Sequence, residues 1–248
     1  MNLTEENLRE KKFHDKLQSK TKGRFENIFY KAIYNANEDF YKYLELNSNN
    51  SLVLDYGCGI GHTLENVANF NPKKITGIDI SEVSIEKAKN RIKELGLKNI
   101  DLKVDNCEKT SFRDNEFDIV YGTGILHHLQ ISKCIEEILR ILKPGGKLLF
   151  IEPIGTNPII NLYRKLTPNS RSKDEHPLTI KDFNLIKKSF FKTDVKYYGF
   201  LTLVFFPFYT NPKKSFFFRI LKNVDQILFK IKIFRPFSWS TLIIAEKG

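Results

Sequence analysis

The 248-residue chain has little cysteine, one methionine, one tryptophan and no long hydrophobic run. Its cysteines, Cys58, Cys107 and Cys134, are odd in number and lack C-x-x-C spacing, so neither a disulfide framework nor a zinc site is predicted. The longest apolar stretch, residues 199–209, contains Pro207 and is too short to span a bilayer. The first residues, MNLTEENLREKKFHDK, lack the apolar core of a signal peptide. These absences predict a cytoplasmic protein.

Acidic residues are also in deficit, since 29 Asp and Glu face 40 Lys and Arg, for a formal charge of +11. Such a charge favours an anionic partner, but it does not choose between nucleic acid, a membrane surface and a phosphorylated substrate. The hydrophobic content of 41% is ordinary for a globular protein, and the length fits one domain.

Short apolar runs alternate with helical patterns along much of the chain. Strands are predicted at residues 51–56, 75–79, 100–104, 117–121, 147–152, 193–200 and 240–246, and helices at residues 5–46, 62–70, 82–95, 131–142 and 180–190. Strands that alternate with helices predict a parallel sheet with helices on both faces.

The run VLDYGCGIGHTLENVA, residues 53–68, places three glycines directly after the first predicted strand. Glycines at this turn let the backbone approach a ligand closely at the carboxyl edge of an open sheet. The dinucleotide-binding pattern G-x-G-x-x-G is absent, because His62 stands where its last glycine would fall. Asp79, at the end of the second strand, suits a pair of ribose hydroxyl groups.

Four blocks, V-L-D-Y-G-C-G-I-G, G-I-D-I-S, F-D-I-V-Y and L-K-P-G-G, follow in order between residues 53 and 153. Together they resemble the class I S-adenosylmethionine-dependent methyltransferases that act on small molecules; an NAD-binding fold is the alternative. The resemblance implies an α/β, Rossmann-like, seven-stranded sheet, mostly parallel with an antiparallel last strand. It also implies one domain over residues 1–248, with a helical lid (1–48), a cofactor-binding core (49–153), a substrate-side segment (154–238) and the last strand (239–248).

The resemblance further implies S-adenosylmethionine as the cofactor. Asp55 would hold the glycine turn and the methionine amino group, Asp79 the ribose, and Ile80 the adenine. The cofactor-binding residues implied are Asp55, Gly57, Cys58, Gly59, Gly61, Asp79, Ile80, Asn106, Cys107 and Gly122. Asn106 departs from the Asp usual in such proteins, although an amide oxygen also accepts hydrogen bonds. The alternative roles are structural: Asp55 caps the turn, Asp79 stabilises a helix N-terminus, and the cysteines only pack.

The segment GTGILHHL, residues 122–129, follows the fourth predicted strand at the reactive end of the cofactor in this fold. It lacks the N/D-P-P-Y/F motif of enzymes that methylate nucleic-acid amines and the acidic cluster of magnesium-dependent catechol enzymes. We therefore expect neither a DNA partner nor a metal. His127 and His14 are the catalytic candidates, because imidazole changes charge near neutral pH. Alternatively, His127 is bonded to backbone and His14 is solvated.

The segment EPIGTNPIINLYRKLTPNSRSKDEHPL, residues 152–178, is similar to a bacterial subgroup of these methyltransferases that also carries F-H-D near its start. The likeness implies an acceptor pocket that includes Tyr163, Arg164, Arg171, Glu175 and His176. The basic residues here favour an anionic acceptor methylated on oxygen, such as a phosphorylated or nucleotide-linked precursor of a surface polysaccharide or a phosphoramidate. A solvated basic loop is the alternative.

Residues 213–235 carry seven basic residues and one acid, with apolar residues at helical spacing. We expect this stripe to pack on its own domain or on a second subunit, which would make a homo-oligomer. The alternative is contact with an anionic membrane, as in a lipid or quinone methyltransferase. A third possibility is a non-catalytic cofactor-binding or RNA-associated protein.

Overall fold

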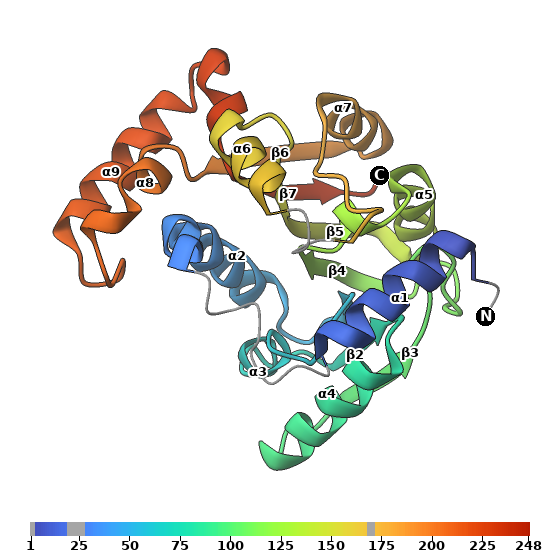
Figure 1. The fold of residues 1–248 in the computed structure, drawn as a ribbon. Helices are drawn as coiled ribbons and strands as arrows, with labels where there is room; N and C mark the ends of the chain where they lie inside the picture. Colours follow the sequence, from blue (N-terminus) through green and yellow to red (C-terminus); the bar gives the residue numbers. More distant parts are fainter. Residues whose placement is uncertain (1–2, 19–27, 168–171) are drawn as a thin grey trace.

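The computed structural model describes residues 3–18, 28–167 and 172–248, and the sheet at its centre has seven strands (Figure 1). The strands are β1 (Leu52–Tyr56), β2 (Lys74–Asp79), β3 (Ile100–Val104), β4 (Phe117–Thr123), β5 (Leu142–Pro153), β6 (Lys192–Tyr198) and β7 (Ser240–Glu246). Their order across the sheet is β3-β2-β1-β4-β5-β7-β6.

The first five strands are parallel, and β7 is antiparallel between β5 and β6. The strand order reverses between β1 and β4, so a ligand-binding crevice is expected outside the carboxyl ends of these two strands. The predicted α/β class, with a seven-stranded, mostly parallel sheet and an antiparallel last strand, is confirmed.

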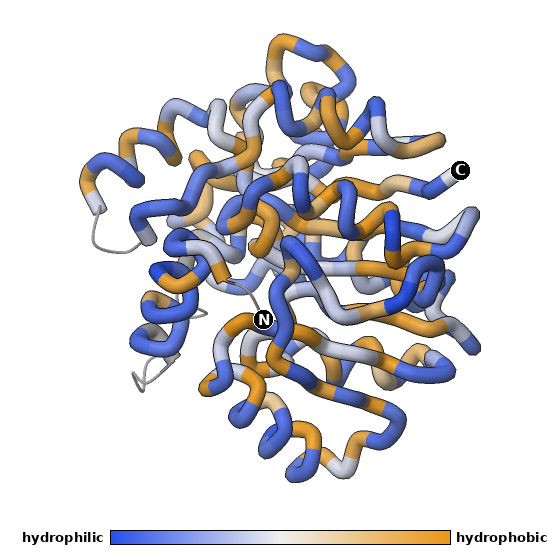
Figure 2. The backbone as a smooth tube through the Cα atoms, turned by 90° about the vertical axis from the view of Figure 1, so that its right-hand side faces the viewer, coloured by the Kyte–Doolittle hydropathy of each residue, from blue (hydrophilic) through white to orange (hydrophobic). Residues whose placement is uncertain are grey.

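Helices cover both faces of the sheet. On one face α5 (Ile131–Ile141) and α7 (Ile180–Ser189) pack through Ile135, Ile138, Phe183 and Ile186. On the other lie α2 (Tyr34–Asn47), α3 (Leu64–Ala68) and α4 (Glu82–Glu94). Figure 2 shows the strands as mainly hydrophobic stretches in the interior, whereas the outer helices alternate hydrophobic and hydrophilic residues. This alternation follows from helices that bury one face only.

Local sequence signals account for several boundaries. The Ser81 hydroxyl accepts a hydrogen bond from the Ser84 amide and so caps α4, as predicted. The strand β5 begins at Leu142, which pairs with Phe117, five residues before the strand predicted at residues 147–152. The continuous helix expected over residues 5–46 is wrong: α1 (Glu5–Gln18) and α2 are α-helices, but residues 28–33 form the 3-10 helix η2 (Ile28–Ile33).

After β5 the chain adds short helices around the antiparallel end of the sheet. They are α6 (Pro158–Leu166), α8 (Leu201–Val204), η5 (Phe206–Phe208), α9 (Phe216–Leu228) and η6 (Lys232–Phe237). The helices α8 and α9 form a lobe beside the sheet (Figure 1). Within the described residues, no helix combines the length and the apolar character that a membrane crossing requires.

Candidate functional site

Acidic side chains end four of the parallel strands at one edge of the sheet. Asp55 lies near the end of β1, Asp79 ends β2, Asp105 follows β3, and Glu152 lies near the end of β5. His127 lies in the 3-10 helix η3 (Leu126–His128), which follows β4. The carboxyl ends of parallel strands meet at one edge, so the fold brings these distant residues to the crevice.

The turn after β1 carries Gly57, Gly59 and Gly61 at φ values of 78°, 53° and 79°. This left-handed region is costly for residues with a Cβ atom. A Cβ atom added to Gly59 would meet no described atom within 4 Å, so the turn leaves room above this residue. Gly122 differs, because an added Cβ atom would lie 2.5 Å from the Phe150 ring. Packing inside the sheet therefore requires glycine at position 122.

Asp55, near the end of β1, is hydrogen-bonded to a residue that comes just after the glycine turn. Its carboxylate accepts hydrogen bonds from the hydroxyl groups of Thr63 and, at 3.0 Å, Tyr121. The side chain is buried, and burial raises the pKa of Asp55 to about 7. The hydrogen bond from Thr63 thus links Asp55 to the end of the turn, and Thr63 was not among the residues selected from the sequence.

Asp79 links the same turn to the end of β2. Its two carboxylate oxygens accept from the amides of Gly59 and Ser81, each at 2.9 Å. Burial raises the pKa of Asp79. The Ser81 hydroxyl also donates to Asp15 of α1. The helix α1 therefore contacts Ser81, the residue that caps α4. Ile80 lies between Asp79 and Ser81, both of which are held by hydrogen bonds.

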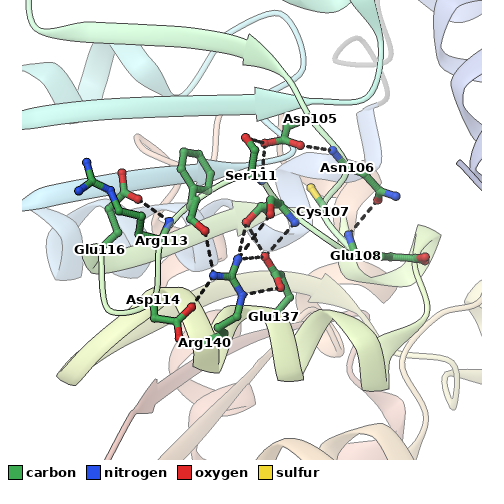
Figure 3. Close-up of polar contacts among 12 residues, drawn as sticks. Asp105, Asn106, Cys107, Glu108, Ser111, Arg113, Asp114, Glu116, Glu137 and Arg140 are labelled. Atoms are coloured by element: carbon green, nitrogen blue, oxygen red, sulfur yellow. Dashed lines mark hydrogen bonds and ion pairs between the residues drawn. The ribbon is translucent and has the colours of Figure 1, made fainter. Parts of the chain in front are cut away.

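Asn106 lies in a loop that several polar contacts hold in place (Figure 3). Its side-chain oxygen accepts from the Glu108 amide at 2.9 Å, and its Nδ2 donates to Asn7 of α1 at 3.3 Å. Asp105 accepts from the amide and hydroxyl groups of Ser111. Cys107 and Cys58 are both buried, which raises the pKa of each thiol well above its ordinary value. Both thiols therefore stay protonated at neutral pH.

His127 and Glu152 form a buried dyad. The Nδ1 atom of His127 lies 2.7 Å from Glu152 Oε2, and Glu152 Oε1 accepts from the amides of Ile125 and Leu126. Burial raises the pKa of Glu152 to about 7. Since Glu152 orients the Nδ1 side of the ring, Nε2 is the imidazole atom that would act on an acceptor.

The second histidine candidate lies close to the first. His14 of α1 packs edge-on against His128, with ring centroids 5.1 Å apart, and the rings of His127 and His128 are 4.1 Å apart. Glu10 of α1 lies between His14 and His128, 3.5 Å and 3.2 Å from their ring nitrogens. Sequence reasoning missed Glu10, although its position one helical turn before His14 was a usable signal.

The predicted acceptor residues are divided between two places. A ligand atom of Glu175 lies within 4.8 Å of atoms of His127 and His128. The His176 amide donates to the His127 carbonyl, although its side chain is exposed. Tyr163 and Arg164 lie on α6, where Arg164 donates to Asn161 at 3.2 Å. Arg171 lies outside the described residues.

The residues present fit S-adenosylmethionine. The glycine turn offers close backbone approach, and the Asp79 oxygens each accept only one hydrogen bond from described residues, which leaves lone pairs for a ribose diol. Asp55 and Asn106 would hold the methionine and adenine ends. The bound cofactor supplies an activated methyl group on a sulfonium sulfur.

Comparisons with known proteins agree with this geometry. A family model described as "Methyltransferase domain" matches residues 47–194. The chain is 35% identical over 116 residues to a sterol 4-C-methyltransferase of Caenorhabditis elegans. The aligned residues are 46% of this chain and 34% of that protein. It is 34% identical over 116 residues to a demethylmenaquinone methyltransferase of Lactococcus lactis, and the aligned residues are 46% of this chain and 45% of that protein. This chain thus spans less than half of the length of these curated relatives.

Solved structures share the fold at low identity. A phosphoethanolamine N-methyltransferase of Haemonchus contortus in complex with S-adenosylmethionine has a TM-score of 0.65 at 18% identity, covering 96% of this chain and 60% of that one. A geranyl diphosphate C-methyltransferase of Streptomyces coelicolor with bound S-adenosylhomocysteine has a TM-score of 0.64 at 15% identity, covering 86% and 78%. The YcgJ protein of Bacillus subtilis has a TM-score of 0.58 at 17% identity, covering 85% and 98%.

Proposed function

This chain belongs to the methyltransferase domain family and forms an S-adenosylmethionine-dependent methyltransferase domain, and we propose that it methylates an oxygen atom of a small, polar, anionic acceptor. Three of its curated relatives are named for sterols, menaquinone and phosphoethanolamine, so family membership leaves the acceptor open. The proposal rests on the side chains at the reactive end of the site.

The observation that carries the proposal is the His127–Glu152 dyad, with its 2.7 Å separation. A hydroxyl acceptor loses its proton as the methyl group transfers, so a base beside it accelerates the reaction by about 10²–10⁴. Glu152 acts through His127, because its carboxylate keeps the Nδ1–H tautomer and makes Nε2 the atom that accepts the proton. In-line alignment of the acceptor with the methyl group supplies the rest.

The anionic part of the acceptor is expected beyond the dyad, toward α6. The carboxylate of Glu152 lies against His127 and would repel an anion there. Arg164 and Lys165 lie in the last turn of α6, and arginine can hold phosphate or carboxylate oxygens with two hydrogen bonds. A phosphorylated hydroxyl compound satisfies both requirements.

Glu152→Gln tests the base. The amide of the variant keeps an oxygen for the two backbone N–H groups, but its NH₂ group donates to Nδ1 and reverses the His127 tautomer. We expect kcat to fall about 10²-fold or more while the dissociation constant of S-adenosylmethionine stays within a factor of two or three. Release of S-adenosylhomocysteine from a panel of phosphorylated and uncharged hydroxyl compounds gives the rate.

His127→Ala should lose a similar factor, and the double variant no more than either single one, because the two residues act as a unit. Additive losses, or full activity of Glu152→Gln, would refute the dyad. Turnover of uncharged compounds alone would refute the anionic acceptor. No release of S-adenosylhomocysteine with any compound would favour a non-catalytic or RNA-associated role.

A second candidate, methylation of a lipid or quinone at a membrane, is favoured by the surface of α9. Phe218 and Leu221 pack inward, so the prediction that residues 213–235 pack on their own domain holds for these two. Leu228 is half-buried, and five further apolar residues are exposed: Phe217, Ile220, Val224, Ile227 and Ile231. Lys213, Lys214, Arg219 and Lys230 supply positive charge nearby.

Sedimentation with vesicles of phosphatidylcholine and phosphatidylglycerol separates the two candidates. Co-sedimentation of the wild type that is lost in Ile220→Glu and Ile227→Glu, together with turnover of a vesicle-borne quinone, would favour the lipid acceptor. A protein that stays in the supernatant and methylates a phosphorylated compound would favour the first proposal.

A further inference from the structure

Glu10, His14 and His128 gather three metal-binding side chains at one point. Glu10 and His14 are four residues apart on α1, so they share a face of the helix. His128 comes from η3, at the end of β4. One ligand atom from each of the three lies within 4.8 Å of the other two. The cluster thus joins the N-terminal helix to the carboxyl edge of the sheet.

The two separations from Glu10 to the histidines match those of ligands around one small cation. Glu10 Oε2 lies 3.2 Å from His128 Nδ1 and 3.5 Å from His14 Nε2. Ligand atoms 2.0–2.1 Å from a tetrahedral zinc ion lie about 3.4 Å from one another. A hydrogen bond between imidazolium and carboxylate is shorter, about 2.7–2.9 Å. The His127–Glu152 pair, at 2.7 Å, is an example in the same site.

The polar atoms of the cluster are buried without satisfied hydrogen bonds. The side chains of Glu10 and His128 are 6% and 3% exposed. Among the described residues, neither oxygen of Glu10 and neither ring nitrogen of His128 makes a hydrogen bond of normal geometry. Buried polar atoms left in this state cost free energy, whereas a bound cation would satisfy the carboxylate and one nitrogen of each ring.

We propose that Glu10, His14 and His128 bind one divalent cation of the zinc class. Two imidazoles and one carboxylate suit zinc or iron(II), whereas magnesium and calcium prefer oxygen ligands alone. Three protein ligands leave at least one coordination position for water or an acceptor oxygen. A second group, His127, His128 and Glu175, overlaps this one at His128, but His127 Nδ1 is already committed to Glu152.

The sequence lacks both C-x-x-C spacing and the acidic cluster of magnesium-dependent enzymes, so we expected no metal, but neither signal bears on a His/Glu site assembled from α1 and η3. The cation would link α1 to η3 at the carboxyl edge of the sheet. At this edge Asp15 of α1 already contacts Ser81, and Asn7 contacts Asn106. Metal binding and the closure of α1 are therefore expected to be coupled.

Zinc binding to the full chain tests the site. The protein is stripped with EDTA, exchanged into a non-coordinating buffer and titrated with zinc chloride by calorimetry, while cobalt(II) absorption reports the coordination. We expect one equivalent to bind at micromolar concentration or below, and a rise in Tm. His128→Ala and Glu10→Gln should weaken binding at least tenfold and abolish the rise in Tm. Glu5→Gln, on the same helix, and His176→Ala are matched controls that should bind as the wild type does.

Each variant is first shown to be folded by circular dichroism. Should His128→Ala fail this check, Glu10→Gln and His14→Ala decide alone. A wild type that takes up less than about 0.1 equivalent of zinc would overturn the proposal, as would equal affinities of the wild type and Glu10→Gln. The metal assay needs no methyl acceptor, so its result is independent of the proposed reaction.

Discussion

The amide nitrogen of Gly59 lies 2.9 Å from Asp79 Oδ2, and this contact joins the turn after β1 to the end of β2. The other oxygen of Asp79 accepts from the Ser81 amide at 2.9 Å. One carboxylate thereby fixes the two loops that border the proposed ribose site, and it keeps one unused lone pair on each oxygen for a ligand.

Asp79→Ala should lose most of its affinity for S-adenosylmethionine. If Asp79 accepts from both ribose hydroxyl groups as proposed, the variant loses two charge-assisted hydrogen bonds, which together contribute on the order of 2–4 kcal/mol. Calorimetry on the folded variant measures the change, and Asp101→Ala, an exposed residue of β3, is the control. Near-normal affinity in folded Asp79→Ala would contradict the ribose assignment, as would tight binding of NAD by the wild type.

Asp55→Asn should change how stability depends on pH. Burial raises the pKa of Asp55 from 3.8 to about 7, so between these values the folded chain holds a proton that the unfolded chain releases. The free energy of unfolding of the wild type therefore falls, on this account, as pH rises from about 4 to 7, by up to about 4 kcal/mol.

Asparagine keeps an oxygen for Thr63 and Tyr121 but does not titrate. The stability of Asp55→Asn relative to the wild type should rise across this pH window and level off above it. Urea unfolding at pH 5, 6, 7 and 8 measures the difference, in which the titration of Glu152 cancels. A difference that does not change with pH would show that Asp55 is ionised throughout.

The cofactor edge could be predicted from the sequence because its residues lie at the ends of predicted strands or just after them. Gly57 and Gly59 come just after the first predicted strand and Asp79 ends the second, and parallel strands place their carboxyl ends side by side. Ser81 was predicted as a cap because capping is a local interaction. The alternation of strands and helices depends on such local signals, whereas the seven-stranded sheet with an antiparallel last strand was implied by the resemblance.

The contacts between α1 and the sheet could not be predicted in this way. Glu10 contacts His128, which lies 118 positions later in the sequence, and the hydrophobic pattern of neither segment indicates this contact. The prediction began the fifth strand at residue 147, but β5 begins at Leu142, because this residue pairs with Phe117 of β4. Tertiary pairing outweighed the local preference there.

Glu137→Gln should destabilise the chain through the loop shown in Figure 3. Glu137 Oε1 accepts from the Thr110 amide at 2.8 Å and from Arg140 at 2.6 Å. Although burial acts in the opposite direction, Arg140 and Thr110 hold the pKa of Glu137 below its ordinary value. Loss of the charge should cost about 1–3 kcal/mol of unfolding free energy, measured in urea. Glu136→Gln, exposed on the same helix, should change stability by no more than about 0.5 kcal/mol.

Arg164→Lys tests the charge of the acceptor. Arg164 lies in the last turn of α6, which follows β5, and its guanidinium donates to Asn161 at 3.2 Å, a contact that orients the group. Lysine keeps the positive charge but cannot make two parallel hydrogen bonds to phosphate. With a phosphorylated acceptor, we expect the KM to rise about tenfold, the cost of one such hydrogen bond, while the affinity for S-adenosylmethionine is unchanged.

The control is Lys165→Gln, because Lys165 is the exposed neighbour of Arg164 on the same turn. If only net charge steers the acceptor, Lys165→Gln should raise the KM more than Arg164→Lys, and the effect should fade at high salt. If Arg164 holds the phosphate directly, the order reverses and the effect persists in salt. Equal kinetics for the wild type and both variants would place the anionic group elsewhere, and the exposed stripe of α9 would then become the better guide to the acceptor.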